Sequence, residues 1–448
     1  MHRIDPGRKH RVVVVGGGFA GMQVVRGLRR APVEVTLIDR QNFTLFQPLV
    51  YQVATGALSP AEISMPHRSL LRRQANARVL LAEVLGFDLD ARNVLIETRA
   101  GIRRQSTVGY DTLVVATGSH YSYFGHEEWQ PHAPELKSLD GALDIRSRIL
   151  SAFEAAELSD DEELRQEWLT FVVVGGGPTG VEMAGQIAEL GQDALRRDFH
   201  GLDTGRTRVL LVEASERLLA AFPPALSAKA EHSLEELGVT PLAGHTVVDV
   251  DGEGVAIRRP DGVDERVSAR TVVWAAGVAA SGLAGELAEA AGVEPDRSGR
   301  VPVGLDFTLP FHPEVFAVGD MVRELPAPLP GLAPVAIQEG RWVARAIRAR
   351  LDGREPRPFR YRDKGNLATI GRLRAVADVR GLKLAGFVAW AIWLLVHLFY
   401  LAGFQNRLMV VLRWTISFVT RGRGSRLIVP ARTERAPEQK PLERREAA

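Results

Sequence analysis

The sequence predicts an α/β protein with two doubly wound, Rossmann-like domains, followed by an apolar helical region near its C-terminal end. A strand, a glycine-rich turn and the start of a helix follow one another at 12–21, and the same pattern returns at 171–180. The 448 residues suffice for two or three domains with separate cores. A nearly uninterrupted apolar run at 384–404 sets the C-terminal region apart.

The first glycine motif has the features of a dinucleotide-binding site. Four valines at 12–15 predict a strand buried on both faces, and the next strand, 33–38, ends in Asp39. The glycines between them are Gly16, Gly18 and Gly21. They permit a sharp turn, a close approach of the backbone to a pyrophosphate, and tight packing of the helix that follows. A glycine cluster alone can mark only a turn, but the flanking strands and the acid favour a dinucleotide.

The second motif repeats the first. A strand at 171–174 leads into Gly175, Gly177 and Gly180, and the strand at 208–212 ends in Glu213. Two such motifs predict two bound dinucleotides. Glu213 lies 33 residues after Gly180, compared with a usual spacing of about 20. A carboxylate at this strand end accepts hydrogen bonds from a ribose 2′-hydroxyl and repels a 2′-phosphate, which favours NADH over NADPH.

Three further strand ends extend the pattern. The strand at 110–116 runs into Thr117 and Gly118, and the strand at 271–276 runs into Gly277. Small residues at these ends let a cofactor lie close to the backbone. A third strand, 315–318, is followed by Gly319 and Asp320. Asp320 can hold flavin hydroxyls, or it can cap the helix that follows.

The remaining elements follow from periodicity and turn residues. Strands are expected at 79–84 and 93–98 and near residues 247, 255 and 267, with helices at 60–72, 140–157 and 335–351. An aromatic loop at 42–56, which contains Gln47, is either one wall of a site for a flat ring or a packed connection. An acidic turn at 159–163 marks a domain boundary.

The chain contains no cysteine, which excludes disulfides, thiolate metal sites and a dithiol redox relay. Electrons must therefore pass through bound cofactors, and no metal site is predicted. The first ten residues are polar, so we expect no signal peptide and place the protein on the cytoplasmic side of the cell membrane.

The formal net charge of +2 hides an asymmetry along the chain. Between Lys364 and Arg426 there are ten basic residues and one acid, Asp378, so this segment carries +9 and the remainder −7. A basic segment rich in apolar residues predicts contact with an anionic lipid surface. Nucleic acid is not expected, because the acidic remainder would repel phosphate.

The apolar run at 384–404 is interrupted only by His397 and is long enough, at about 20 residues, to cross a bilayer. The next segment places Asn406, Arg413, Ser417 and Thr420 on one narrow polar stripe, which predicts an interfacial helix. We expect the region to lie in one leaflet, with a single span as the alternative. The charged tail after Pro430 is expected to be disordered.

Together, these motifs resemble the type II NADH:quinone oxidoreductases, single-subunit flavoproteins that lie on one membrane leaflet. The matching stretches are 16–21, 46–59, 114–119, 122–125, 136–139, 175–182, 211–213, 274–278, 318–320, 363–369 and 387–404. The resemblance implies a glutathione-reductase-like architecture and a reaction that carries a hydride from NADH to FAD and then electrons to a membrane quinone, menaquinone or ubiquinone, without proton pumping. It is also compatible with a homodimer.

The resemblance also assigns residues to the two cofactors. The residues implied to bind FAD are Gly16, Gly18, Gly21, Asp39, Gln47, Thr117, Gly118 and Asp320. Those implied to line the NADH site are Gly175, Gly177, Gly180, Glu213 and Gly277. Glu182, Gln338 and Lys364 are the candidates for polarising the acceptor or relaying protons. Glu182 could equally be an acid in the first turn of a helix, stabilised there by the helix dipole.

One position departs from the family pattern. Members carry two glutamines spaced A-Q-x-x-x-Q near the flavin, whereas this chain has Pro334 in place of the first and Gln338 as the second. Proline offers neither a side-chain amide nor a backbone N–H. Two alternatives therefore stay open: a reductase with a non-quinone acceptor, similar to soluble disulfide or ferredoxin reductases, and a flavin-binding protein with vestigial redox activity.

The predicted domain organisation follows from these assignments. A FAD-binding domain is expected in two parts, 8–145 and 301–352, with an NADH-binding domain, 146–300, inserted between them. A membrane-anchoring region follows at 353–428, and the tail occupies 429–448.

Overall fold

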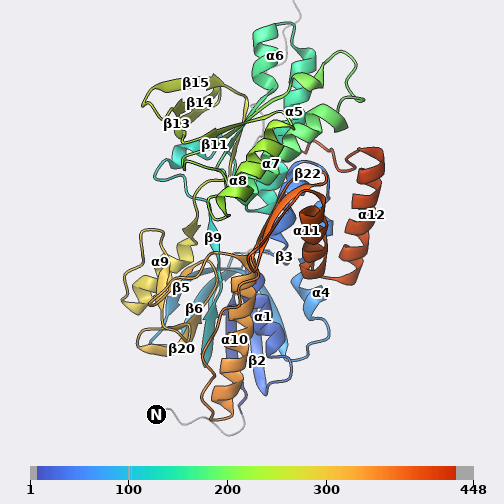
Figure 1. Cartoon of the computed structure of the whole chain (residues 1–448). Helices are drawn as coiled ribbons and strands as arrows, with labels where there is room; N and C mark the ends of the chain where they lie inside the picture. The colour runs from blue at the N-terminus through green and yellow to red at the C-terminus, as the bar shows by residue number, and fades with distance from the viewer. Residues whose placement is uncertain (1–7, 99–100, 102, 430–448) are drawn as a thin grey trace, which may run out of the picture.

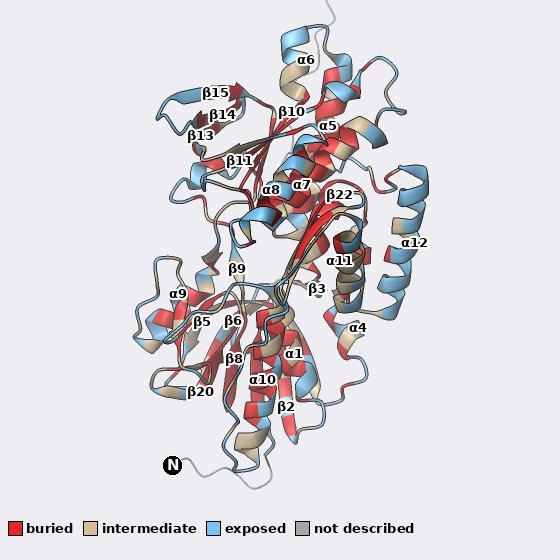
Figure 2. Cartoon of the chain, in the orientation of Figure 1, coloured by how far each residue is buried: buried red, intermediate tan, exposed pale blue. Residues whose placement is uncertain are grey.

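The structure is a computed structural model that describes residues 8–98, 101 and 103–429. Two units, each with a central sheet, lie one above the other, and a smaller sheet with two helices lies beside the junction between them (Figure 1). Buried residues concentrate in the two central sheets and in the helices that cover them (Figure 2). This arrangement confirms the predicted α/β class. The predicted tail after Pro430 lies outside the described residues.

The first sheet has eight strands. In spatial order they are β19 (Thr308–Leu309), β20 (His312–Ala317), β8 (Thr112–Val115), β1 (His10–Val15), β2 (Val33–Asp39), β5 (Ala77–Asp88), β6 (Asn93–Thr98) and β7 (Gln105–Gly109). The strands from β20 to β5 are parallel, and the outer pairings are antiparallel. Because β20 pairs with β8, the chain returns to this sheet after building the second unit.

The second sheet is parallel throughout. Its strands, in spatial order, are β12 (Val239–Ala243), β11 (Arg208–Glu213), β10 (Thr170–Val174) and β16 (Thr271–Trp274). An antiparallel sheet flanks it, made of β13 (Thr246–Asp251), β14 (Gly254–Arg258) and β15 (Asp264–Ser268). The short ladders are β9 (Ser119–His120) with β17 (Ala279–Ala280), β18 (Val301–Val303) with β21 (Val322–Glu324), and β3 (Phe43–Leu45) with β4 (Ser64–Pro66).

Twelve α-helices lie in the described part of the chain. They are α1 (Phe19–Gly27), α2 (Val50–Ala54), α3 (Pro60–Ile63), α4 (His67–Leu71), α5 (Leu139–Leu158), α6 (Glu162–Trp168), α7 (Pro178–Glu189), α8 (Pro224–Glu235), α9 (Gly282–Ala291), α10 (Ala333–Leu351), α11 (Phe387–Tyr400) and α12 (Phe404–Thr420). The helices expected at 140–157 and 335–351 are confirmed by α5 and α10. Close packing of α10 on α1 requires Gly340, where a Cβ would lie 2.2 Å from the Ala20 carbonyl oxygen.

The helix predicted at 60–72 is wrong as a single element. It is divided into α3 and α4 by the strand β4, which pairs with β3. The physical reason is Pro66, because a proline disfavours the helical conformation at the residue before it and cannot donate a helical hydrogen bond. Met65 is accordingly extended and pairs with Thr44.

The domain boundaries stay predictions, and one packing contact bears on them. α9 falls inside the segment predicted to bind NADH, 146–300. Its buried side chains Ala284, Leu287 and Ala288 nevertheless belong to the core of the first sheet. We therefore propose that the inserted segment ends before Gly282.

The C-terminal region begins with a three-stranded antiparallel sheet. Its strands are β22 (Asn366–Gly371), β23 (Arg374–Val379) and β24 (Leu382–Ala385). This sheet packs on α7 so closely that a Cβ on Gly185 would lie 1.8 Å from the Ile370 carbonyl oxygen. The apolar run at 384–404 therefore starts in β24, turns at Gly386 and continues as α11, which has 14 residues. None of the described helices is long and apolar enough to span a membrane.

The polar stripe of α12 faces the protein at Asn406, Arg413 and Ser417, whereas Thr420 is exposed. The Asn406 amide donates to the carbonyl oxygens of Ala61 and Ser64 at 3.2 and 3.1 Å, and Arg413 lies 3.3 Å from a carboxylate oxygen of Glu62. Large apolar side chains point away from the protein instead, with Phe404 80% and Val419 77% exposed. The predicted amphipathic helix is thus present, and its apolar side has no partner within the described chain.

The basic C-terminal segment uses half of its charges within the molecule. The ion pairs that join it to the rest of the protein are Arg374–Glu236, Arg413–Glu62, Arg421–Asp193, Arg423–Glu189 and Arg426–Asp198. The charge asymmetry along the sequence therefore reflects, in large part, how this segment docks on the acidic remainder.

Candidate active site

The first glycine motif forms the predicted turn between β1 and α1. Gly16 has a φ of +94°, and a Cβ there would lie 2.4 Å from the Ala116 carbonyl oxygen, so only glycine fits. A Cβ on Gly18 would point into open space, whereas one on Gly21 would lie 1.9 Å from the Gly16 carbonyl oxygen. Gly16 therefore lets the turn pass close to the neighbouring strand end, Gly18 leaves room for a ligand, and Gly21 allows the helix to pack on the turn.

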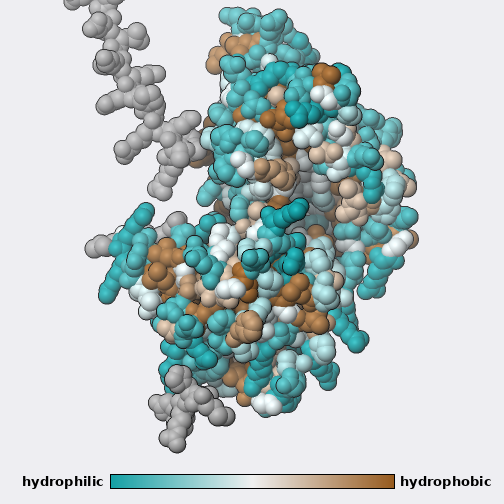
Figure 3. Space-filling model, turned by 90° about the vertical axis from the view of Figure 1, so that its left-hand side faces the viewer, coloured by the Kyte–Doolittle hydropathy of each residue, from teal (hydrophilic) through white to brown (hydrophobic). Residues whose placement is uncertain are grey.

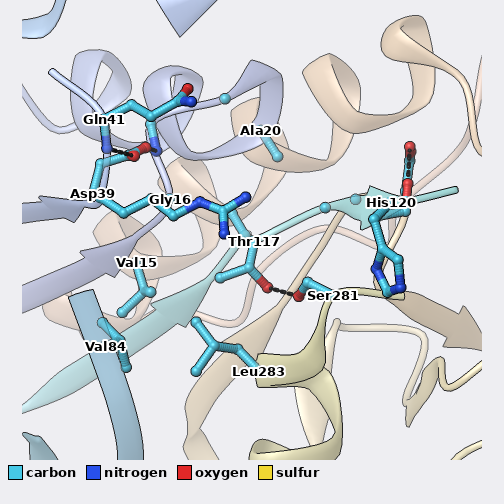
Figure 4. A pocket seen from close by; sticks show the side chains of 18 of the residues that line it. Val15, Gly16, Ala20, Asp39, Gln41, Val84, Thr117, His120, Ser281 and Leu283 are labelled. Carbon is cyan, nitrogen blue, oxygen red and sulfur yellow. Dashed lines mark hydrogen bonds between the residues drawn. The ribbon is translucent and has the colours of Figure 1, made fainter. Parts of the chain in front are cut away.

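The acid at the end of β2 holds this turn. Asp39 accepts hydrogen bonds from the backbone N–H groups of Gly17 at 2.6 Å and Gln41 at 2.7 Å. Figure 4 shows Asp39 and Gln41 at one side of the pocket, with Gly16 between them and Thr117. Asp39 thus lies where the sequence places it, at the carboxyl edge of the sheet beside the glycine turn.

The pocket has a volume of about 550 Å³, within the range of cofactor sites. Of the residues implied to bind FAD, those lining it are Gly16, Gly18, Asp39, Gln47, Thr117, Gly118 and Asp320. Gly21 is not part of the lining, in keeping with its packing role. Gln47 comes from the aromatic loop and donates to the Lys137 carbonyl oxygen at 3.3 Å, so that loop does form one wall.

Asp320 is not a helix cap. The segment after it forms β21, and the next helix, α10, begins at Ala333. Its carboxylate accepts a hydrogen bond from the Ser119 hydroxyl at 2.9 Å and lies 3.7 Å from the Lys137 ammonium. This corrects the capping alternative and leaves Asp320 as a charged group of the pocket.

Sequence reasoning assigned no role to Lys137 and Ser281, although both line this pocket. The ammonium of Lys137 also contacts the Ser119 hydroxyl. Burial lowers the Lys137 pKa, and the neighbouring charge of Asp320 partly offsets that shift. The hydroxyl groups of Ser281 and Thr117 lie 2.6 Å apart (Figure 4). In the sequence, Lys137 is marked only by its place in the stretch 136–139, which resembles the family. No feature of the sequence marks Ser281 as a residue of the site.

The second glycine motif reproduces the backbone of the first. The N–H of Gly175 donates to the Val212 carbonyl oxygen at 2.8 Å, as that of Gly16 does to Ile38 at 2.9 Å. A Cβ on Gly180 would lie 1.7 Å from the Gly175 carbonyl oxygen, and one on Gly177 would meet open space. The predicted duplication is therefore present in the backbone.

Glu213 repeats the contacts of the acid in the first motif. It accepts hydrogen bonds from the N–H groups of Gly176 at 2.5 Å and Ser215 at 2.7 Å. Gly277, at the next strand end, has a φ of +69°. A Cβ on Gly277 would lie 2.5 Å from the ring of Phe124, which is 66% exposed. The predicted NADH residues thus gather at one sheet edge, with an exposed aromatic ring that sequence reasoning did not single out.

Glu182 lies in α7 directly beyond the second motif and is buried. One carboxylate oxygen accepts a hydrogen bond from the Thr369 N–H at 3.4 Å. Burial raises the Glu182 pKa to about 8, because ionisation in an apolar environment is costly. The first-turn alternative is wrong, because Glu182 is the fifth residue of α7 and no acid lies in the first turn of that helix. Its raised pKa instead favours the protonated form at neutral pH.

Polar groups continue from Glu182 toward α12. The Tyr51 hydroxyl accepts from the Gln52 amide at 2.9 Å, and the Gln52 oxygen accepts from the Trp414 indole at 2.8 Å. Burial raises the Tyr51 pKa well above its ordinary value, and the charge of Glu182 adds to this shift. Tyr51, Gln52 and Trp414 line a cavity of about 130 Å³ between α7 and the two C-terminal helices.

Gln338 and Lys364 lie on a different groove, along α10, which Glu182 does not line. The Gln338 amide donates to the Pro334 and Arg362 carbonyl oxygens and accepts from the Arg362 N–H, each at 3.0 Å. Lys364 is exposed and lies two residues after Arg362 in the chain. The structure therefore brings Gln338 and Lys364 together, and the chain from Arg362 to Thr369 connects them to Glu182.

The first pocket fits FAD. Its glycines leave open space beside the turn, Asp39 lies at the strand end where a ribose is recognised, and Lys137 offers a cation to phosphate or polar ring atoms. The second motif has the same backbone and an acid at the same position, which suits the unphosphorylated ribose of NADH.

Comparisons with known proteins agree with this geometry. The family model described as pyridine nucleotide-disulphide oxidoreductase matches residues 10–340, and the NDH2 C-terminal domain model matches residues 364–423. A curated relative from Mycobacterium tuberculosis, the type II NADH:quinone oxidoreductase Ndh, is 45% identical over 94% of this chain and 90% of its own length. This chain belongs to the type II NADH:quinone oxidoreductases.

More distant members agree. The Staphylococcus aureus type II NADH:quinone oxidoreductase is 30% identical over 84% of this chain and 92% of its own. A solved structure of NDH2 from Plasmodium falciparum in complex with NADH has the same fold, with a TM-score of 0.87 over 94% of this chain and 100% of its own, at 19% identity. FAD is the cofactor of the type II NADH:quinone oxidoreductases and NADH their electron donor, as predicted from the two motifs.

The position that departs from the family pattern has a structural explanation. Pro334 lies in the first turn of α10, where a backbone N–H has no acceptor within the helix, so proline is well tolerated there. The helix start is therefore maintained, while Pro334 offers no side-chain amide at this point.

Proposed function

We propose that this chain oxidises NADH and passes the electrons through FAD to a membrane quinone, without pumping protons. The observation that carries the proposal is the contact between the two motifs. β17, just beyond Gly277, pairs with β9, just beyond Gly118, and the Ser281 N–H donates to the Gly118 carbonyl oxygen at 3.1 Å. The two strand ends therefore meet in one place, as transfer between two cofactors requires.

FAD, when bound, supplies the redox chemistry: it accepts a hydride from NADH and passes electrons on singly or in pairs. The protein binds and orients. Asp39, Lys137 and Asp320 place charges around the first pocket, and Glu213 selects the unphosphorylated ribose of NADH.

Glu182 is proposed to supply a proton on the acceptor side. Reduction of a quinone to a quinol consumes two protons. With its pKa raised to about 8, the Glu182 carboxyl group is protonated at neutral pH and yet acidic enough to release a proton when negative charge develops nearby. Its proton can be replaced through the polar groups that lead toward α12.

Gln338 and Lys364 are proposed to act where the quinone arrives. The Gln338 amide is fully engaged by the Pro334 and Arg362 backbone, so its role is to position the loop that carries Lys364. The exposed Lys364 ammonium is then free to polarise a quinone oxygen, since no ion pair involves it in the described part of the chain.

The protein is proposed to lie on the cytoplasmic face of the cell membrane, held in one leaflet by α11 and α12. The side chains that support this are Phe387, Leu395, Phe399, Phe404, Leu412, Ile416 and Val419, all exposed and apolar. The face seen in Figure 3 differs, because it is mostly hydrophilic with scattered apolar residues. Association of two copies stays a prediction, which light scattering on the detergent-solubilised protein can test.

The experiment is a steady-state assay of the purified protein with NADH and a panel of menaquinone and ubiquinone analogues, with ferricyanide as a soluble control. We expect turnover with at least one quinone. Turnover with ferricyanide but with no quinone would favour a reductase with another acceptor. Reduction of the flavin without turnover on any acceptor would favour vestigial activity, the alternative that Pro334 raised.

A further inference from the structure

A wide groove runs between α10 and the extended segment 353–365 that follows it, with a volume of about 1040 Å³. Eight basic side chains line it: Arg341, Arg345, Arg348, Arg354, Arg357, Arg360, Arg362 and Lys364. Only one acid, Glu355, lies among them. Most of these residues precede the basic segment noted in the sequence, so the groove is a separate concentration of positive charge.

The groove has two opposed basic walls. Arg341, Arg345 and Arg348 are exposed at positions i, i+4 and i+7 of α10, which places them on one face with rises of about 6 and 10 Å. The opposite wall is fixed to the core, because the Trp342 indole donates to the Arg357 carbonyl oxygen at 2.7 Å. The Phe359 ring packs on Phe307 at 4.9 Å. The groove is therefore a fixed shape of the fold.

Most of these charges lack an acidic partner, although Arg341 donates to the side-chain oxygen of Gln23 at 3.0 Å. Arg354 pairs with Asp352, but the structure records no ion pair for the other seven basic residues of the groove within the described ranges. The C-terminal segment differs, since half of its charges are paired. Seven like charges around one groove repel one another, and a bound anion removes that cost. Guanidinium groups on two walls suit phosphate, which they bind through paired N–H donors.

The lining also favours an amphiphile over a bare anion. Ala349, Pro356 and Pro358 provide apolar surface between the arginines. Tyr400, the last residue of α11, also lines the groove, and its neighbour Phe399 is 70% exposed. A molecule with a phosphate in the groove could therefore extend apolar chains over α11.

We propose that this groove binds the headgroup of an anionic phospholipid, with the phosphate between Arg345 and Arg348 of α10 and Arg357 and Arg360 of segment 353–365. Gln338 and Lys364, which are proposed to meet the quinone, are not part of this headgroup site. The proposal rests on the proposed function in one respect, the contact of α11 with lipid. It adds a defined headgroup site outside the apolar helices, and it predicts that membrane affinity depends on lipid charge through this groove.

The experiment uses the full-length, FAD-loaded protein and two kinds of vesicle: pure phosphatidylcholine, and phosphatidylcholine with about one lipid in four replaced by phosphatidylglycerol. Affinity is measured by co-sedimentation. We expect the wild-type protein to bind the anionic vesicles at least tenfold more tightly. Arg345→Gln/Arg348→Gln should remove most of that gain, since each basic contact with an anionic surface contributes about fivefold.

The matched control is Arg29→Gln/Arg30→Gln, which removes the same charge from exposed residues outside the groove. It should retain the gain. A second groove variant, Arg357→Gln/Arg360→Gln, should behave like the first, and thermal melting of each holoprotein excludes misfolding. Equal losses in the control and groove variants would overturn the proposal in favour of diffuse attraction, as would no loss in either groove variant.

Calorimetry distinguishes the source of the phosphate. Dihexanoylphosphatidylglycerol below its micelle concentration should bind the wild-type protein and not the groove variants, and inorganic pyrophosphate should bind at least tenfold more weakly. Equal or tighter binding of pyrophosphate would overturn the lipid assignment. Binding to neutral vesicles reports on α11 and α12, and NADH–quinone turnover reports on the proposed function, so their failures are separable from that of the groove.

Discussion

The two glycine motifs share a backbone and differ in what surrounds them. Gly16 and Gly175 make the same turn, Gly21 and Gly180 allow the same helix packing, and an acid accepts the same pair of backbone hydrogen bonds in each. The first motif, however, opens into a pocket to which distant segments contribute Lys137, Ser281 and Asp320. The second has at its edge the exposed ring of Phe124.

The difference explains how one backbone design serves two purposes. A cofactor surrounded by charged and hydrogen-bonding groups from several segments stays bound, which suits FAD. A site formed mainly by one turn and one acid lets its ligand exchange, which suits a substrate such as NADH. The motifs supply recognition of a dinucleotide, and the surrounding segments determine how long it stays.

The largest effects are expected from substituting the glycine that lets the helix pack on the turn in each motif, Gly21 in the first and Gly180 in the second. In Gly21→Val, the new Cβ would lie 1.9 Å from the Gly16 carbonyl oxygen, which is a severe clash. We therefore expect loss of FAD and of the folded first unit. Gly180→Val should abolish NADH oxidation while leaving the purified protein yellow. Flavin absorbance and circular dichroism measure both outcomes, and a colourless Gly180→Val protein would show that the two motifs are not independent.

Exchanging the acid of the second motif should change its coenzyme. Glu213→Arg removes the carboxylate that accepts the Gly176 N–H and places a cation where a 2′-phosphate would lie. We expect the ratio of kcat/KM for NADH over NADPH to fall on the order of 100-fold, ~2.7 kcal/mol. Glu213→Gln, which removes only the charge, is the control. Its ratio of kcat/KM for NADH over NADPH should lie between those of the wild-type protein and Glu213→Arg. An unchanged NADH KM in Glu213→Arg would contradict the assignment.

Removing charge from the first pocket should weaken retention without changing the reaction. Asp320→Asn keeps the shape but loses the charge beside Ser119 and Lys137. We expect FAD to dissociate about 10-fold more readily, because hydrogen bonds to a charged group contribute ~1.5–3 kcal/mol. Flavin fluorescence during dilution measures this. Asp306→Asn, on the surface of the same unit, is a matched control that should retain FAD normally.

The smallest effect on cofactor binding concerns the residue two positions beyond each packing glycine, Gln23 in the first motif and Glu182 in the second. Since the Glu182 pKa is raised to about 8, the unfolded chain loses this proton near pH 4.5 while the folded protein keeps it. Stability should therefore fall as pH rises from about 4.5 to 8, by roughly 5 kcal/mol at most.

Glu182→Gln makes the second motif like the first and should remove that loss. We expect a higher melting temperature than wild type at pH 9, little change at pH 4, and slower quinone reduction at neutral pH with unaltered flavin reduction by NADH. Calorimetry across pH and rapid mixing measure these effects. Parallel pH–stability curves for the two proteins would show that Glu182 is not buried in a neutral form.

The sequence predicted what depends on local patterns. Strands, glycine turns and the acids at strand ends are encoded within about 40 residues, and they recur in the structure with matching hydrogen bonds. Lys137 and Ser281 are polar residues in irregular or short segments, with no periodicity to mark them. Only the tertiary fold brings them to Asp320 and Thr117, so no local pattern could identify them.

The C-terminal region shows the same limit. Its apolar run predicted helix correctly, yet the polar stripe of α12 gave no sign of whether it faced water or protein. The ion pair of Arg413 with Glu62, and the hydrogen bonds of Asn406 to Ala61 and Ser64, settle that question. The helix predicted at 60–72 failed for a related reason, because the pairing of β4 with β3 and the effect of Pro66 outweighed the local apolar pattern.

The central claim is that electrons from NADH leave through FAD toward a quinone, and anaerobic rapid mixing tests it most directly. NADH should bleach the flavin absorbance of the purified holoprotein, NADPH should do so far more slowly, and a subsequent menaquinone analogue should restore the colour. A flavin that NADH leaves unbleached, or that stays bleached when quinone is added, would contradict the account.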